Sequence, residues 1–71
     1  MKNLNQIAKI LSNLTKNIEH AKYIGYGMIA IHDYRTMQAV TYQLSLRDIY
    51  DYTVTQRSID NTYKVTVNYS E

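Results

Sequence analysis

The sequence contains no cysteine, proline, tryptophan or phenylalanine, and it has only two glycines. Without cysteine the chain has neither a disulfide nor a thiolate metal site, which fits a reducing compartment. The sequence also lacks a long uncharged apolar run of the kind that spans a membrane or forms the core of a signal peptide. We therefore expect a soluble, cytoplasmic protein that has no membrane partner.

The chain has 71 residues, close to the size at which the burial of a core only just offsets the entropy lost on folding. We expect a single small domain over residues 1–71, with a helix over 1–21 and two antiparallel hairpins over 22–71. A core of this size without disulfides is often stabilised by oligomerisation, so we also predict a homodimer. The net charge of +2 indicates neither a strongly acidic nor a strongly basic protein.

The first third of the chain has the apolar spacing of an amphipathic helix. Apolar residues recur at alternating intervals of three and four, and the stripe consists of Leu4, Ile7, Leu11, Leu14, Ile18 and Ala21. Lys2, Lys9 and Lys16 recur every seven residues on the opposite face, and Asn3 or Asn5 caps the start. The stripe predicts a helix that is buried on a sheet. The alternative is a coiled-coil seam between subunits.

The end of the chain has the pattern of a β-hairpin. Two alternating segments, 52–59 and 62–69, flank Asp60 and Asn61, which tolerate the left-handed conformation of a tight turn. A two-residue loop would place Val54 opposite Val67. The outward face would then carry polar side chains, namely Thr53, Thr55, Arg57, Lys64, Thr66 and Asn68.

We predict a second hairpin over residues 23–46, with its turn around Asp33, Tyr34 and Arg35 and with His32 opposite Met37. In its second strand the large side chains alternate, and Val40, Tyr42, Leu44 and Leu46 share one face. This register places Tyr42 opposite Gly27 and Leu44 opposite Gly25. A helical turn over 46–51 would join the two hairpins. The sequence thus predicts an α+β fold of the order α-β-β-turn-β-β, an N-terminal amphipathic helix packed on a four-stranded antiparallel sheet.

This arrangement leaves an apolar strip without a partner on the sheet. If Ile29 and Ile31 face the helix, then Ile24, Tyr26, Met28 and Ala30 lie on the other face, and contiguous exposed apolar surface is typical of interfaces. We predict a partner-binding surface made of Ile24, Tyr26, Met28, Tyr34 and Arg35.

The predicted function is that of a small non-enzymatic protein-protein interaction module. The composition is rich in Asn, Ile, Lys and Tyr, which indicates an AT-rich coding genome of the kind found in low-GC bacteria and their phages. The most concrete form of the prediction is a phage or mobile-element inhibitor that occludes a host protein.

The alternative function is the binding of single-stranded nucleic acid. Residues Gly25, Tyr26, Gly27 and Ile29 resemble the first ribonucleoprotein motif of RNA-recognition domains. The chain departs from that motif at Ile24, Met28 and Ile31, where the motif has a basic residue and two aromatic ones, and the predicted element order also differs. Independently of the motif, exposed tyrosines together with Lys22, Arg35, Arg57 and Lys64 would stack and clamp a single strand.

The sequence indicates no enzyme, and it predicts no catalytic residue, cofactor or metal site. The titratable candidates are two histidines and four aspartates, namely His20, His32, Asp33, Asp48, Asp51 and Asp60. Adjacent residues of a strand, such as His32 and Asp33, point to opposite faces and do not form a pair. A domain this small also has little volume for a deep pocket.

Overall fold

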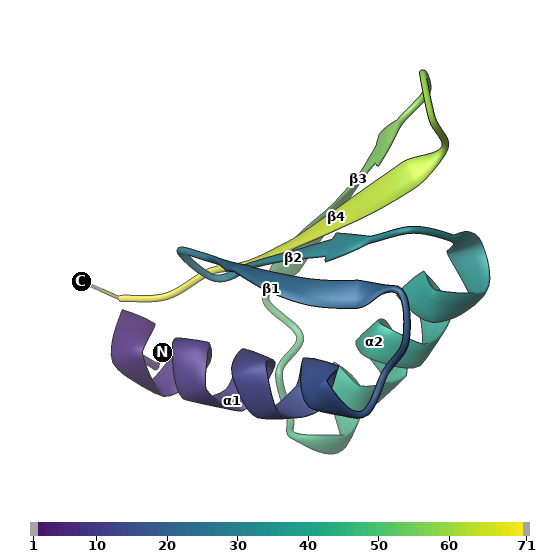
Figure 1. The fold of residues 1–71 in the computed structure, drawn as a ribbon. Coiled ribbons are helices and arrows are strands. Elements are labelled where there is room, and N and C mark those ends of the chain that lie inside the picture. Colours follow the sequence, from purple (N-terminus) through teal and green to yellow (C-terminus); the bar gives the residue numbers. More distant parts are fainter. Residues whose placement is uncertain (1, 71) are drawn as a thin grey trace.

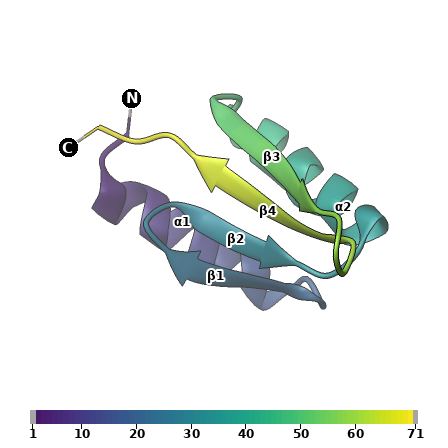
Figure 2. The same ribbon diagram turned by 90° about the horizontal axis from the view of Figure 1, so that it is seen from above.

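The computed structural model describes residues 2–70, and the end residues 1 and 71 of the predicted domain lie outside this range. The elements are α1 (Leu4–Lys16), β1 (Ala21–Gly25), β2 (Met28–Ile31), α2 (Tyr34–Leu46), β3 (Tyr52–Arg57) and β4 (Thr62–Val67). The strands form one sheet in the order β1-β2-β4-β3, and all neighbours are antiparallel. Both helices lie against the same face of this sheet (Figure 1), and the opposite face is uncovered in the view from above (Figure 2). The predicted α+β fold, a helix on a four-stranded antiparallel sheet, is confirmed.

Helix α1 begins with a capping box. The backbone N–H of Gln6 donates to the Asn3 side chain (2.9 Å), and the backbone N–H of Asn3 donates to Oε1 of Gln6 (3.0 Å). The helix ends at Lys16, so it is shorter than the predicted range of 1–21. Its stripe is buried within a single copy of the chain through Ile7, Leu11 and Leu14. This burial excludes the alternative of a coiled-coil seam along α1.

The segment predicted as the second strand of the 23–46 hairpin is instead helix α2. The Asp33 side chain accepts a hydrogen bond from the backbone N–H of Thr36 (2.7 Å) and caps the start of the helix. Residues four apart are then buried together, namely Thr36, Val40 and Leu44. The predicted pairing of His32 with Met37 is therefore wrong, and α2 ends at Leu46, where a short helical turn was predicted to begin.

The first hairpin turns at Tyr26 and Gly27, not around Asp33. Gly25 (φ +97°), Tyr26 (φ +53°) and Gly27 (φ +76°) all have left-handed backbone, which a regular strand does not tolerate. The two glycines thus permit a tight turn, and they do not lie beside large side chains of the segment that forms α2, as was predicted. Of the residues that resemble the ribonucleoprotein motif, Gly25, Tyr26 and Gly27 lie at this turn and Ile29 follows in β2, whereas the motif requires one continuous strand.

The β3–β4 hairpin at the end of the chain has the predicted faces but a different register. Tyr52 pairs with Val67 and Val54 pairs with Val65, a shift of two residues from the prediction, because the loop spans four residues, 58–61. Asn61 has the expected left-handed backbone (φ +57°). A shift of two residues preserves which side chains share a face, so the apolar side of the hairpin still meets the core.

The core lies between the sheet and the two helices. Its buried members are Ile7, Leu11, Leu14, Ile29, Ile31, Val40, Leu44, Ile49, Val65 and Val67. Four tyrosines pack against the core from the sheet side and the C-terminal segment, namely Tyr23, Tyr52, Tyr63 and Tyr69. One face of each central strand is thereby buried, and the other remains available for function.

Candidate functional site

The candidate site is the uncovered face of the sheet, which we call the open face. The alternation of the strands and their register place ten side chains on it, namely Lys22, Ile24, Met28, Ala30, Thr53, Thr55, Arg57, Thr62, Lys64 and Thr66. Within the described chain no helix crosses this face (Figure 2). The open face is therefore a surface that the fold leaves without an internal partner.

The side chains on the open face are arranged in rows across the strands. Met28 pairs with Thr66, which in turn pairs with Thr53, and this row lies nearest to the β1–β2 turn. The next row consists of Lys22, Ala30, Lys64 and Thr55. The third row contains Arg57 and Thr62. The open face is thus apolar and hydroxyl-bearing toward the turn and basic toward the opposite end.

We call the end of the open face that lies away from the β1–β2 turn the basic end. It carries three cations, Lys22, Arg57 and Lys64, and none of the four described strands contributes a carboxylate to it. Lys22 and Lys64 both pair with Ala30 from opposite sides, which places their backbones about 10 Å apart, twice the spacing between strands. Because Ala30 is small, the aliphatic stems of both lysines have room to lie along the sheet. The pair therefore presents two ammonium groups around an apolar floor.

Two histidines extend the basic end. The backbone N–H of His32 donates to the carbonyl of His20 (3.0 Å), which continues the β1–β2 ladder by one pair. The two rings lie 5.8 Å apart between centroids. Sequence reasoning treated these histidines separately. The register about a turn at Tyr26 would have revealed the pair, because residues 20 and 32 are equally far from that turn.

A hollow of about 420 Å³ lies on the open face. Ile24 and Ala30 contribute apolar atoms to its lining, and Thr55, Arg57 and Lys64 contribute polar ones. The acidic residue Asp60, from the loop between β3 and β4, also lines the hollow. Arg57 also makes a long, exposed ion pair with Asp60 in the adjacent loop (Nε to Oδ2, 3.9 Å). An exposed pair of this length contributes little to stability and leaves the guanidinium accessible to a ligand.

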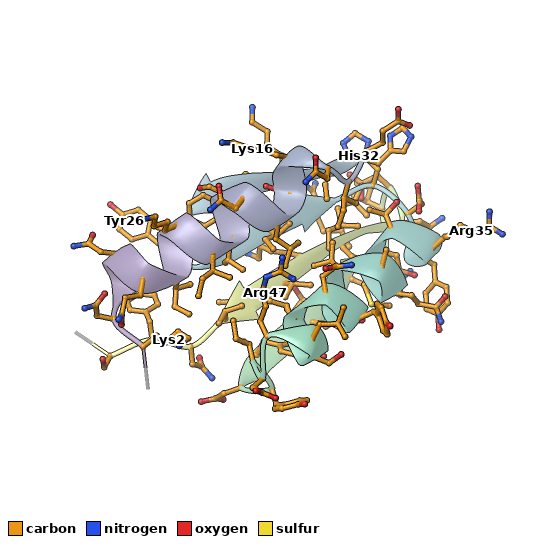
Figure 3. The ribbon with its side chains drawn as sticks, turned by 90° about the horizontal axis from the view of Figure 1, so that it is seen from below. Lys2, Lys16, Tyr26, His32, Arg35 and Arg47 are labelled. Atoms are coloured by element: carbon orange, nitrogen blue, oxygen red, sulfur yellow. The ribbon has the colours of Figure 1, made fainter. Side chains whose placement is uncertain are left out.

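The structure brings together only part of the predicted partner-binding surface. Ile24 (47% exposed) and Met28 lie on the open face, and Tyr26 (70% exposed) lies at the turn that borders it. Tyr34 instead lies at the start of α2, where its ring is 6.1 Å from that of Tyr63 on the helix side of the sheet. Arg35 also belongs to α2, and Figure 3 shows it at the opposite end of the molecule from Tyr26. The predicted grouping of Tyr34 and Arg35 with the strip is wrong because these residues start a helix.

Three of the four residues predicted to bind nucleic acid lie together on the open face. They are Lys22, Arg57 and Lys64, whereas Arg35 lies on α2. No tyrosine accompanies them on the described strands of this face. The four tyrosines that do not pack on the core are Tyr26, Tyr34, Tyr42 and Tyr50, which lie at a turn, on α2 and in a loop. The open face therefore has cations but lacks aromatic platforms for base stacking.

The remaining titratable candidates are held in local hydrogen bonds. The Asp33 carboxylate accepts from Thr36, which lowers the pKa of Asp33, and the nearby His20 and His32 lower it further. The hydroxyl and backbone N–H of Thr62 lower the pKa of Asp60 in the same way, with a smaller effect from Arg57. Both carboxylates are exposed. The hydrogen bonds of Asp33 cap helix α2, and those of Asp60 hold the loop before β4.

Asp48 and Asp51 both line a groove of about 500 Å³ beside the start of α1. Asp51 accepts a hydrogen bond from the Asn68 side chain (2.7 Å), and Asp48 has left-handed backbone after α2. Across residues 2–70, no group of three or more His, Cys, Asp and Glu side chains is placed to hold a metal ion. Likewise, neither helix in this range is long and apolar enough to cross a membrane.

Comparison with known proteins adds no assignment. The chain matches no protein-family model, no curated protein and no solved structure. A functional proposal therefore depends on the chemistry of the open face alone.

Proposed function

We propose that the protein is a non-enzymatic interaction module that uses its open face to cover an acidic surface of another protein. The observation that supports this proposal is the combination of Lys22, Arg57 and Lys64 with an apolar floor on an uncovered sheet, without a carboxylate from the described strands. A module of this kind acts by occupying its partner, so we propose that it is an inhibitor. Its partner would have carboxylates around a small apolar centre.

The charge of the open face also indicates what does not bind there. Two copies that met through this face would bring Lys22, Lys64 and Arg57 of one copy close to those of the other. Like charges placed together at an interface cost several kcal/mol. A partner of opposite charge fits the face, whereas a second copy of the chain does not.

The second candidate function is the binding of single-stranded nucleic acid, since three of the four predicted cations share the open face. The missing aromatic residues make this the weaker proposal, because single-strand binding combines a basic surface with stacking. Both proposals depend on the same lysines, so one pair of variants tests both of them.

The test compares two double variants of equal charge change. Lys22→Glu with Lys64→Glu alters the open face, whereas Lys9→Glu with Lys16→Glu alters the exposed side of α1 on the other side of the molecule. Each protein is used as bait, and a captured protein is purified and titrated. We expect it to bind the wild type and the α1 variant alike and to bind the open-face variant at least tenfold more weakly.

Equal binding to both variants would refute the use of the open face. The nucleic-acid function is tested in parallel by fluorescence anisotropy of labelled single-stranded RNA and DNA at low and high salt. Binding that weakens steeply with salt and is lost in the open-face variant would establish the second candidate and displace the first.

A further inference from the structure

Helix α2 has a second stripe on the side that faces away from the sheet. Arg35, Ala39, Tyr42 and Leu46 recur at intervals of four, three and four, which is the spacing of a coiled-coil seam. All four are exposed, with Tyr42 at 62% and Leu46 at 59%. The stripe on the core side of α2 is a different set, Thr36, Val40 and Leu44. We call the outer set the α2 seam.

The α2 seam differs from the exposed side of α1 in its charge. The exposed side of α1 carries Lys9 and Lys16 among asparagine and glutamine. Within Tyr34–Leu46, by contrast, Arg35 is the only charged residue. A helix face with exposed tyrosine and leucine and almost no charge is typical of a surface that packs on another helix.

We infer that the α2 seam is a dimer interface, in which α2 of a second copy of the chain packs antiparallel to the first. In an antiparallel pair, seam residues meet in layers, so Ala39 of each copy lies beside Tyr42 of the other. The small side chain leaves room for the large one, and this match occurs twice about the two-fold axis.

The ends of the seam are complementary in charge. The same register places Arg35 of each copy beside Leu46 of the other, at the C-terminal end of α2, where the helix carries partial negative charge. Asp48 follows that end and is exposed. In Figure 3, which views the molecule from the helix side, Arg35 extends outward at the start of α2, while Arg47 lies between the two helices. Arg35 is therefore free to reach the second copy. At the C-terminal end of α2 the exposed charges of Arg47 and Asp48 offset one another, so the partial negative charge of the helix end is what attracts Arg35.

This interface is independent of the open face, because α2 lies on the other side of the sheet (Figures 1 and 2). The dimer would present two open faces pointing away from each other. A dimer of this kind would join two copies of the chain without bringing the basic ends of their open faces together.

The test measures self-association by sedimentation equilibrium from micromolar to millimolar concentration. Two variants carry the same substitution: Tyr42→Arg places a cation in the seam, and Tyr26→Arg places one at the exposed β1–β2 turn. We expect the wild type and Y26R to form dimers and Y42R to dissociate at least tenfold more readily. Circular dichroism spectra of both variants serve as the control for folding.

A wild type that remains monomeric throughout this range, or equal association of the two variants, would overturn the inference. The absence of cysteine provides a second readout, since Ala39→Cys introduces a single thiol. Helices packed in this way have axes about 8–10 Å apart, so a short bismaleimide should link two A39C chains. A cysteine at exposed Asn13 of α1 serves as the matched control, and cross-linking at Asn13 but not at Ala39 would also overturn the inference.

Discussion

Individual residues set the turns of this fold, and the two glycines do so for different reasons. Gly25 (φ +97°) has no atom within 4 Å of where a β-carbon would lie. At Gly27 (φ +76°) a β-carbon would lie 2.6 Å from the carbonyl oxygen of Val67. The N–H of Val67 also donates to the carbonyl of Gly27 (2.8 Å). Gly27 is thus required both by its backbone conformation and by the close approach of the C-terminal end of β4.

This difference predicts unequal effects of the same substitution. Gly25→Ala should cost about 1–2 kcal/mol, the strain of a left-handed alanine. Gly27→Ala should cost about 1–3 kcal/mol more, because the added methyl group also displaces β4. Urea denaturation of both variants measures the free energy of unfolding. Equal losses would show that the close approach to Val67 has no energetic consequence.

The acid dependence of stability is also determined at the residue scale. Hydrogen bonds from Thr36, together with His20 and His32, lower the pKa of Asp33 below its usual value of 3.8. Because the pKa of Asp33 is lower in the folded state, its carboxylate stabilises the fold at pH values above its pKa in the unfolded chain. This contribution is lost as the pH falls through the pKa of Asp33 in the folded chain. It should therefore be present at neutral pH and disappear below about pH 4.

Asp33→Asn isolates this contribution, since asparagine also caps a helix but does not titrate in this range. We expect the wild type to have the higher melting temperature at neutral pH and the difference to shrink below about pH 4. Asp60 titrates in both proteins and cancels in the comparison. A difference between the two melting curves that does not change with pH would contradict the role of the Asp33 carboxylate.

Among the elements, sequence reasoning missed α2 and also the turn that divides the predicted strand before Asp33 into β1 and β2. Residues 40–46 alternate as a strand would, but Val40 and Leu44 are also four apart, which fits a helix equally well. Two further signals favoured the helix: the cap at Asp33 and the spacing of Thr36 from Val40. The helix α1 and the last hairpin were predictable because their spacing fits only one period. The open face could be predicted from strand alternation. The pairing of His20 with His32 could not, because it depends on the position of the β1–β2 turn.

The helix and strand interpretations of α2 make opposite predictions for two leucines. On a strand, Leu44 and Leu46 would share a face, whereas in α2 Leu44 is fully buried and Leu46 is 59% exposed. Leu44→Ala should therefore cost about 2–5 kcal/mol, and Leu46→Ala should cost less than about 0.5 kcal/mol. Urea denaturation at low concentration, where the seam is dissociated, measures both values. Similar losses for the two variants would contradict the helical assignment.

At the scale of the whole molecule, one core joins every element, so the helices and the sheet depend on each other. Leu11 of α1 is fully buried and belongs to the same core cluster as Val40 of α2 and Val65 of the sheet. The apolar face of this sheet is removed from water only by the helix layer that packs on it. The chain should therefore unfold as one cooperative unit, although its two helices are far apart in sequence.

This cooperativity has a direct test, because the chain has eight tyrosines and no tryptophan. Four of the tyrosines pack on the core from the sheet side and the C-terminal segment, so tyrosine fluorescence reports mainly on that packing, while far-ultraviolet circular dichroism reports mainly on the helices. We expect both signals to change at the same urea concentration. Leu11→Ala, which costs about 2–5 kcal/mol, should lower both midpoints together. If the circular dichroism midpoint fell while the tyrosine midpoint stayed unchanged, α1 would be a separately melting helix, and the sheet with α2 would be stable without it.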